Sequence, residues 1–233
     1  MPAGLSIAAV VATGIALVAV GTIILWLARP EHRKLALTAM LVMLPMQPVA
    51  FYLVRVPALT WLQTLFASGD VMMIAGLLAA PLTEEPAKWL ALACAGLRAA
   101  IRSGSALGIA MAVGLGFGIG EIWFIAEQLS RVPALQAAPA AQFWGFVIER
   151  VAVCFLHGLF IVPLFHALAT GRHIVLAALA GIAAHLLTNL PILAVRADLF
   201  GLGPAAWGGM ALIWPIILVA AGLCLITRPA YRA

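Results

Sequence analysis

The sequence predicts an all-α membrane protein, a polytopic bundle of about seven transmembrane helices. Hydrophobic residues make up 65% of the 233-residue chain and charged residues only 9%, whereas a soluble domain has about 25% charged residues. The mean hydropathy is +1.15. Apolar runs of roughly 20 residues, long enough to cross a bilayer, recur along the whole length. We therefore expect residues 1–233 to form a single integral-membrane domain.

The spans are bounded by charged residues, prolines and glycines. The first run is too long for a signal-peptide core and lacks a preceding basic region, so we expect a retained helix. The third span exceeds the bilayer core, which favours a tilt or a break at Pro81 and Pro86. We interpret Val56–Gly69 as interfacial, with part of another span as the alternative. The predicted spans are residues 4–28, 35–54, 71–97, 105–126, 146–170, 174–195 and 207–227.

The distribution of Lys and Arg predicts the orientation of the chain. Alternate joints hold eight of these residues (Arg29, Arg33, Lys34, Arg98, Arg102, Arg172, Arg228, Arg232) and the opposite joints four (Arg55, Arg131, Arg150, Arg196). This asymmetry places the N-terminus outside and the C-terminus in the cytoplasm. Because the basic residues are scattered singly at helix ends, the net charge of +5 reflects membrane topology and excludes a nucleic-acid partner.

Two further patterns indicate packing. Glycine occurs at every second position from Gly114 to Gly120, and small residues four apart allow neighbouring membrane helices to approach closely. The three cysteines, Cys94, Cys154 and Cys224, each lie in an apolar run and form no CxxC pair. We interpret them as small packing residues.

Charged residues inside a predicted span are the most informative feature of the chain. Glu84, Glu85 and Lys88 lie within five residues of one another, and a charge at the bilayer centre costs roughly 2.5–3.5 kcal/mol. The two prolines of this span free backbone carbonyls, which are tolerated at that depth only against protein or water. The pattern predicts a water-filled cavity beside Glu84.

Later spans carry Glu121, His157, His185 and Asn189. Counting 1.5 Å per residue from the span ends places Glu84, His157 and His185 within about 5 Å of one level in the bilayer. Carboxylate and imidazole groups at one level suit a metal site in a bundle core, and zinc in particular. The alternative is that each group serves packing. Glu85 and Lys88 would then neutralise one another, and Asn189 would hydrogen-bond a neighbouring helix.

In their order along the chain, these residues resemble the motifs of a known group. The matches are Glu84–Lys88 to EExxK, Phe117–Glu121 to FxxxE, Arg150 and His157 to an R-then-H helix, and His185–Asn189 to HxxxN. Over residues 80–190, within a motif-bearing core of residues 71–195, the chain resembles the PrsW-type intramembrane proteases. These belong with the CAAX prenyl endopeptidases and the bacteriocin-immunity (Abi) proteins, and the YhfC-type membrane peptidases look related. The chain departs from PrsW proteins at Asn189, usually Asp, and from the CAAX branch at Glu121, there His.

The resemblance implies an intramembrane endopeptidase in a bacterial inner membrane, acting on a membrane-anchored protein or peptide. It implies that Glu84 is the general base, that Glu85 and Lys88 hold it in place, and that Asn189 donates to the oxyanion. His157, His185 and Glu121 would ligate Zn²⁺ or act without a metal. The supporting residues would be Phe117 and Arg150, the latter paired with an acid.

Two other classes of function stay open. One is a non-catalytic, partner-binding membrane protein of the same fold, such as an immunity or scaffold protein. The other is an ion-coupled transporter, which would show internal repeats, and none is visible between the two halves. The identity of the substrate and the oligomeric state do not follow from the sequence.

Overall fold

The computed structural model describes residues 1–66, 69–196 and 203–227, and this part of the chain is almost entirely helical, without a β-strand. Arg228, Arg232 and the side chain of Arg196, all used in the orientation prediction, lie outside the description. The helices are α1 (Ala3–Leu27), α2 (Arg33–Met43), α3 (Met46–Ala50), α4 (Val56–Leu65), α5 (Gly69–Trp89), α6 (Ala95–Ala100), α7 (Ala106–Leu129), α8 (Trp144–Thr170), α9 (Ile174–Arg196) and α10 (Gly203–Ile226).

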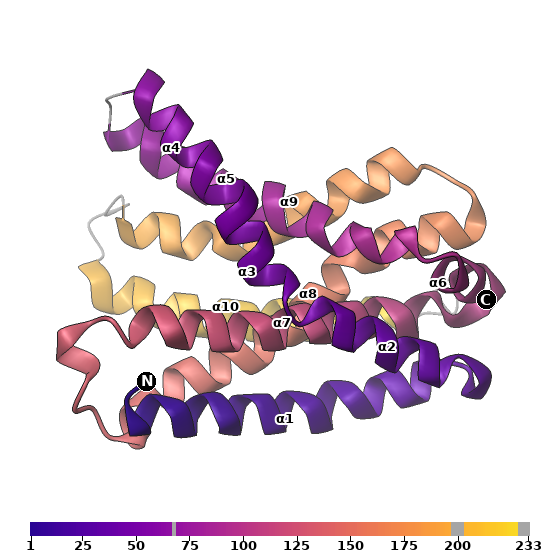
Figure 1. Ribbon diagram of the computed structural model, residues 1–233, viewed down its shortest axis with the longest axis horizontal. Coiled ribbons are helices and arrows are strands. Elements are labelled where there is room, and N and C mark those ends of the chain that lie inside the picture. Colours follow the sequence, from indigo (N-terminus) through magenta and orange to yellow (C-terminus); the bar gives the residue numbers. More distant parts are fainter. Residues whose placement is uncertain (67–68, 197–202, 228–233) are drawn as a thin grey trace.

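The long helices lie roughly along one direction, as in a membrane bundle (Figure 1). Five helical stretches are long and apolar enough to cross a bilayer: α1, α7 with its preceding turns, α8, α9 and α10. A sixth span results if α2 and the helix of residues 46–65, bent by 44° against each other, count as one. The helix α5 is too rich in charged residues to be counted with them. The all-α fold is thus confirmed, with five or six helices in the described residues that could cross a membrane, while seven spans and their orientation stay predictions.

The structure differs from the predicted spans around residues 46–97. A wide π-helical turn, Phe51–Arg55, joins α3 to α4, so residues 46–65 form one nearly continuous helix. Pro57 has no N–H to offer the carbonyl of Leu53, which favours a wide turn there. The segment that we interpreted as interfacial is therefore largely a continuation of the preceding helix, and α4 pairs with α5 at one edge of the bundle (Figure 1).

The helix α5 also ends earlier than predicted. It passes through both Pro81 and Pro86 and ends at Trp89, where a short 3₁₀ turn, Leu90–Ala93, follows. Of the two alternatives, tilt or break, the break at the prolines is therefore absent. The third span breaks instead at Cys94, whose backbone is extended.

The central helix of the bundle is α7, which packs against α1, α2 and α8. Its glycines form two stripes: Gly114 and Gly118 lie against α8, while Gly116 and Gly120 lie against the backbone of α2 and the residue after it. A methyl group added at any of the four would collide with the neighbouring helix. The packing interpretation of the glycine run is confirmed. Cys154 is buried against Gly118, whereas Cys94 and Cys224 are exposed.

Candidate functional site

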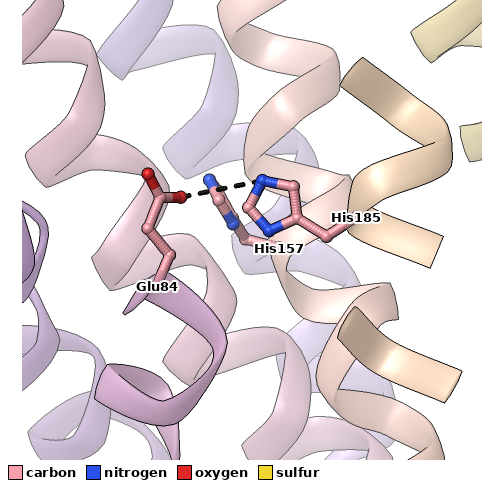
Figure 2. A group of neighbouring side chains, drawn as sticks. All are labelled: Glu84, His157 and His185. Carbon is pink, nitrogen blue, oxygen red and sulfur yellow. Dashed lines mark ion pairs between the residues drawn. The ribbon is translucent and has the colours of Figure 1, made fainter. Parts of the chain in front are cut away.

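Three helices bring a carboxylate and two imidazoles together in the bundle core. Glu84 comes from α5, His157 from α8 and His185 from α9, and one ligand atom of each lies within 4.8 Å of the others (Figure 2). All three side chains are buried. The expectation that they lie at one level of the bundle is confirmed, and the group could hold a metal ion.

The two oxygens of Glu84 have different surroundings. Oε1 forms an ion pair with the guanidinium of Arg55, which also donates from Nε to Thr83 Oγ1 at 3.2 Å. Oε2 is buried without a hydrogen-bond partner and lies 3.8 Å from Nε2 of His185. One oxygen is thus neutralised, and the other is left free beside an imidazole.

Sequence reasoning missed the role of Arg55, which it placed in a joint between spans. Arg55 is the last residue of the π-helical turn that continues into α4. The signal that could have pointed to it is that the pairing of Glu85 with Lys88 leaves Glu84 without a cation, and Arg55 lies at the end of the preceding apolar span. The ion pair with Glu84 was hidden because it depends on how the α4–α5 hairpin folds back.

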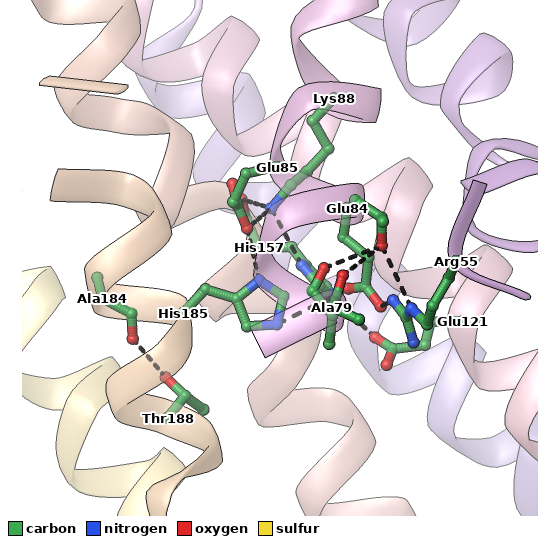
Figure 3. Close-up of polar contacts among 12 residues, drawn as sticks. Arg55, Ala79, Glu84, Glu85, Lys88, Glu121, His157, Ala184, His185 and Thr188 are labelled. Atoms are coloured by element: carbon green, nitrogen blue, oxygen red, sulfur yellow. Dashed lines mark hydrogen bonds and ion pairs between the residues drawn. The ribbon is translucent and has the colours of Figure 1, made fainter. Parts of the chain in front are cut away.

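Glu85 and Lys88 are fully buried and pair with each other, Nζ to Oε1, at 2.6 Å. Both also contact the histidines (Figure 3). His185 Nδ1 lies 2.7 Å from Glu85 Oε1, and His157 Nδ1 lies 3.2 Å from Lys88 Nζ. The two residues neutralise one another, as the alternative interpretation predicted, and they contact the imidazoles. The expectation that they hold Glu84 in place by pairing with it is not met, because no hydrogen bond or ion pair joins either of them to Glu84 within the described residues.

A second chain of contacts fixes His157 from the other side. Its Nε2 lies 2.6 Å from Glu121 Oε2, and Glu121 Oε1 lies 3.0 Å from a guanidinium nitrogen of Arg150. Arg150 also pairs with its neighbour Glu149, a residue that sequence reasoning did not single out. The predicted pairing of Arg150 with an acid is confirmed. Glu121 is not part of the group that could hold an ion, although we expected it to be the carboxylate ligand. Glu84 is the carboxylate of that group instead.

Aromatic rings enclose the histidines. The ring of Phe117 lies edge-on to His157, with centroids 4.9 Å apart. Phe160, which sequence reasoning missed, stacks on His185 at 4.9 Å with an interplanar angle of 14°. Lys88 Nζ lies 5.5 Å from the Phe117 centroid and 5.3 Å from that of Phe160, so the rings also offer π-faces to the buried ammonium.

A cavity of about 700 Å³ opens beside Glu84, between α5, α7, α8, α9 and α10. This volume is within the range of ligand-binding pockets, roughly 300–1,000 Å³. The predicted cavity is present, and Asn189 lines it. Its polar lining residues are Arg55, Glu84, Glu121, Glu149, Arg150, His157, His185, Thr188 and Asn189, and the remaining lining residues are apolar.

The charges of this network do not cancel. Four carboxylates (Glu84, Glu85, Glu121, Glu149) face three cationic side chains (Arg55, Lys88, Arg150). With neutral histidines, the network carries one excess negative charge. An uncompensated charge in a protein interior is strongly disfavoured. The excess negative charge therefore favours the uptake of a proton or the binding of a cation.

Comparison with known proteins gives no assignment: no protein-family model, curated protein or solved structure matches this chain. The functional conclusion therefore depends on the geometry of the site. That geometry comprises a buried Glu/His/His group, a cavity that reaches it, and an excess negative charge.

Proposed function

We propose that this chain is an intramembrane endopeptidase that hydrolyses a peptide bond of a membrane-associated protein or peptide. The observation that carries the proposal is the unpartnered Oε2 of Glu84, which faces Nε2 of His185 at the wall of the cavity. A buried carboxylate oxygen without a hydrogen bond is costly. A water activated there for attack on a substrate would give that oxygen a partner. The resemblance to the PrsW-type and CAAX proteases supports the same class of reaction.

The geometry also restrains the histidines in the way that zinc sites do. Metal-bound imidazoles commonly donate their second ring N–H to a carboxylate. Glu85 accepts from His185 and Glu121 accepts from His157, since both acids are paired with cations and hence ionised. This leaves Nε2 of His185 and Nδ1 of His157 for an ion, the latter on release of its contact with Lys88.

One distance agrees with this donor set. Ligand atoms of one tetrahedral zinc lie about 3.4 Å apart, and the Glu84–His185 pair of atoms is separated by 3.8 Å. We therefore propose that Glu84, His157 and His185 hold Zn²⁺. When bound, the ion would supply a Lewis acid for the substrate carbonyl and the attacking water. The excess negative charge of the network favours such a cation.

The same residues support hydrolysis without a metal. In that form, Oε2 of Glu84 accepts a proton from a water in the cavity while the water oxygen attacks the carbonyl carbon. The proton then passes to the amide nitrogen as the C–N bond breaks. Asn189, one turn from His185, would donate a hydrogen bond to the oxyanion. In both forms Arg55 compensates for the burial of Glu84, and Glu85 with Lys88 keeps the imidazoles in place.

The experiment compares membranes of cells that produce the wild-type chain, E84Q or E127Q. Glu127 is an exposed carboxylate that pairs with Arg131 and lies outside the site, so E127Q is the matched control. Mass spectrometry of protein N-termini should find new cleavage products with the wild type and E127Q, and none with E84Q. An identical set of products in all three, or none in any, would count against the proposal. Zinc content after gentle purification, and activity in a strong chelator, separate the two forms.

A further inference from the structure

The cationic side chains of the chain form two groups. Within the described residues, Arg55, Lys88, Arg131 and Arg150 each pair with a carboxylate. The other six have no carboxylate within ion-pair distance in the same part of the chain: Arg29, Arg33, Lys34, Arg98, Arg102 and Arg172. The charges of these six side chains are therefore free to attract an anion from outside the protein, whereas the four paired cations already have a counter-charge.

All six unpaired cations lie at one end of the bundle. They lie in or beside the joints from α1 to α2, from α6 to α7 and from α8 to α9, with Arg33 and Lys34 at the start of α2 and Arg98 in α6. All three joints are at the right-hand end of Figure 1. Of the eight acidic residues of the chain, only Glu31 falls in these joints. This end therefore carries a strong excess of positive charge that no carboxylate of the described residues neutralises.

Local contacts hold the turn that carries Arg29 against the kink before α7. The turn after α1 lies on the kink Ile101–Ser105, where Ser105 Oγ accepts from the Arg29 backbone N–H at 3.2 Å and lies 2.8 Å from His32 Nδ1. Gly104 has φ +91°, and a side chain there would collide with the Arg29 guanidinium. The Arg29 guanidinium thus lies against the kink that carries Arg102, and the positive φ of residue 104 favours glycine there.

The neighbouring surface is apolar. Leu25, Trp26, Leu37 and Leu41 are more than half exposed on α1 and α2, next to the cations of the α1–α2 turn. Arg33 folds back over the end of α1 and donates to the Leu25 carbonyl at 2.9 Å. Tryptophan beside basic residues at a helix end is typical of the level of lipid headgroups. A ligand at this place would meet several cations at one end and hydrocarbon-facing side chains at the other.

We propose that Arg29, Arg33, Lys34 and Arg102 form a binding site for the phosphate headgroup of anionic phospholipids, with the apolar faces of α1 and α2 against the acyl chains. The site is separate from the peptidase centre, because His157 lies roughly 20 Å along α8 from the end of that helix. Each cation near an anionic surface should strengthen binding about fivefold. The surface would anchor this end of the bundle in the negatively charged leaflet.

The test uses the full chain, purified in a mild detergent, with phosphatidylglycerol, phosphatidylcholine of the same acyl chains, and inorganic phosphate as probes. Binding is followed by native mass spectrometry and by the thermal unfolding midpoint. We expect at least tenfold tighter binding of phosphatidylglycerol than of phosphatidylcholine, and loss of that preference in R29Q/R33Q/K34Q/R102Q. R131Q, at the opposite end of the bundle, should keep it. If the fourfold variant does not fold, R29Q/R102Q should weaken binding by about 25-fold.

Three outcomes overturn the inference. Equal affinity for the two lipids would show that the headgroup charge is not recognised. An unchanged preference in the fourfold or the twofold variant would place the anion elsewhere. Inorganic phosphate that stabilises the wild type as strongly as phosphatidylglycerol, or displaces it, would mean that the cations bind a free phosphate group and that the apolar faces contribute nothing.

Discussion

Nε2 of His157 lies 2.6 Å from Oε2 of Glu121, a hydrogen bond between α8 and α7 deep in the bundle. Two ligands of one zinc ion lie about 3.4 Å apart, so this direct contact makes Glu121 a partner of the imidazole and not a second ligand. The carboxylate fixes which ring nitrogen carries the proton. Its loss should therefore be felt at the opposite nitrogen, where an ion would bind.

We predict that E121Q weakens zinc binding by about 10–100-fold, the usual effect of removing such a partner, and that H185A abolishes it. Zinc affinity would be measured by competition with a fluorescent chelator on purified protein. E127Q, an exposed position on the same helix, is the control and should bind as the wild type does. Wild-type affinity in E121Q would show that Glu121 does not orient a metal-binding histidine.

A second prediction concerns Lys88, whose ammonium is fully buried against Glu85. K88M leaves Glu85 as an uncompensated buried charge, which should lower the free energy of unfolding by about 3–5 kcal/mol. The double variant E85Q/K88M removes both charges and should recover a large part of that loss. Unfolding in mixed detergent micelles gives the comparison.

The exposed pair Arg131–Glu127 supplies the control, since R131M should change stability little. If K88M and the double variant are equally destabilised, the ion pair is not the cause. The loss would then come from the contacts of Lys88 with His157 and the aromatic rings.

Asn189 gives a prediction about rate. If it donates to the oxyanion, N189A should lower kcat by about 10²–10³-fold with little change in KM. The assay would use a substrate identified by mass spectrometry of the membranes of cells that produce the wild-type chain. Thr188, the adjacent residue, also lines the cavity, but its hydroxyl donates to the Ala184 carbonyl. T188V is thus the matched control and should keep most of the activity. A rise in KM alone in N189A would assign Asn189 to substrate binding.

Much of the site could be predicted from helix geometry and the cost of buried charge. Glu84, His157 and His185 share a level because a helix rises by a constant amount per residue. Rotation about the helix axis is not fixed in the same way. Spacing could therefore not decide whether Glu84 or Glu121 completes the group, because both acids lie near the histidines and only packing determines which oxygen is free.

Arg55 could not be predicted for a different reason. It contacts Glu84, which is 29 positions later in the sequence. The contact depends on the hairpin of α4 and α5, whereas we expected the helix before Arg55 to end at residue 54. A π-helical turn and the pairing of α4 with α5 bring it there. By contrast, the glycine run was read correctly from sequence, since close approach of helices is a local requirement of small residues.

The glycines give a fourth prediction. G114A should destabilise the bundle by about 1–3 kcal/mol or more, because the added methyl group meets the backbone of Gly158 and His157. G21A is the control, since nothing lies within 4 Å of the added carbon in α1, and a helical alanine is favoured over glycine. Equal unfolding midpoints for the two variants would contradict the close packing of α7 on α8.

The orientation of the chain gives the last prediction. The connection between α7 and α8 lies at one end of the bundle and the turn between α8 and α9 at the other (Figure 1), because α8 is 27 residues long. In a variant with Cys94, Cys154 and Cys224 changed to alanine, we would place one cysteine by A134C or by H173C, both at exposed positions. A membrane-impermeant maleimide should label A134C in intact bacterial spheroplasts and H173C only after lysis. This follows because the six unpaired cations at the α8–α9 end should be retained in the cytoplasm.

The reverse pattern would place the N-terminus inside. Labelling of both positions from one side would mean that α8 does not cross the membrane, and the proposed peptidase centre could not then lie within it.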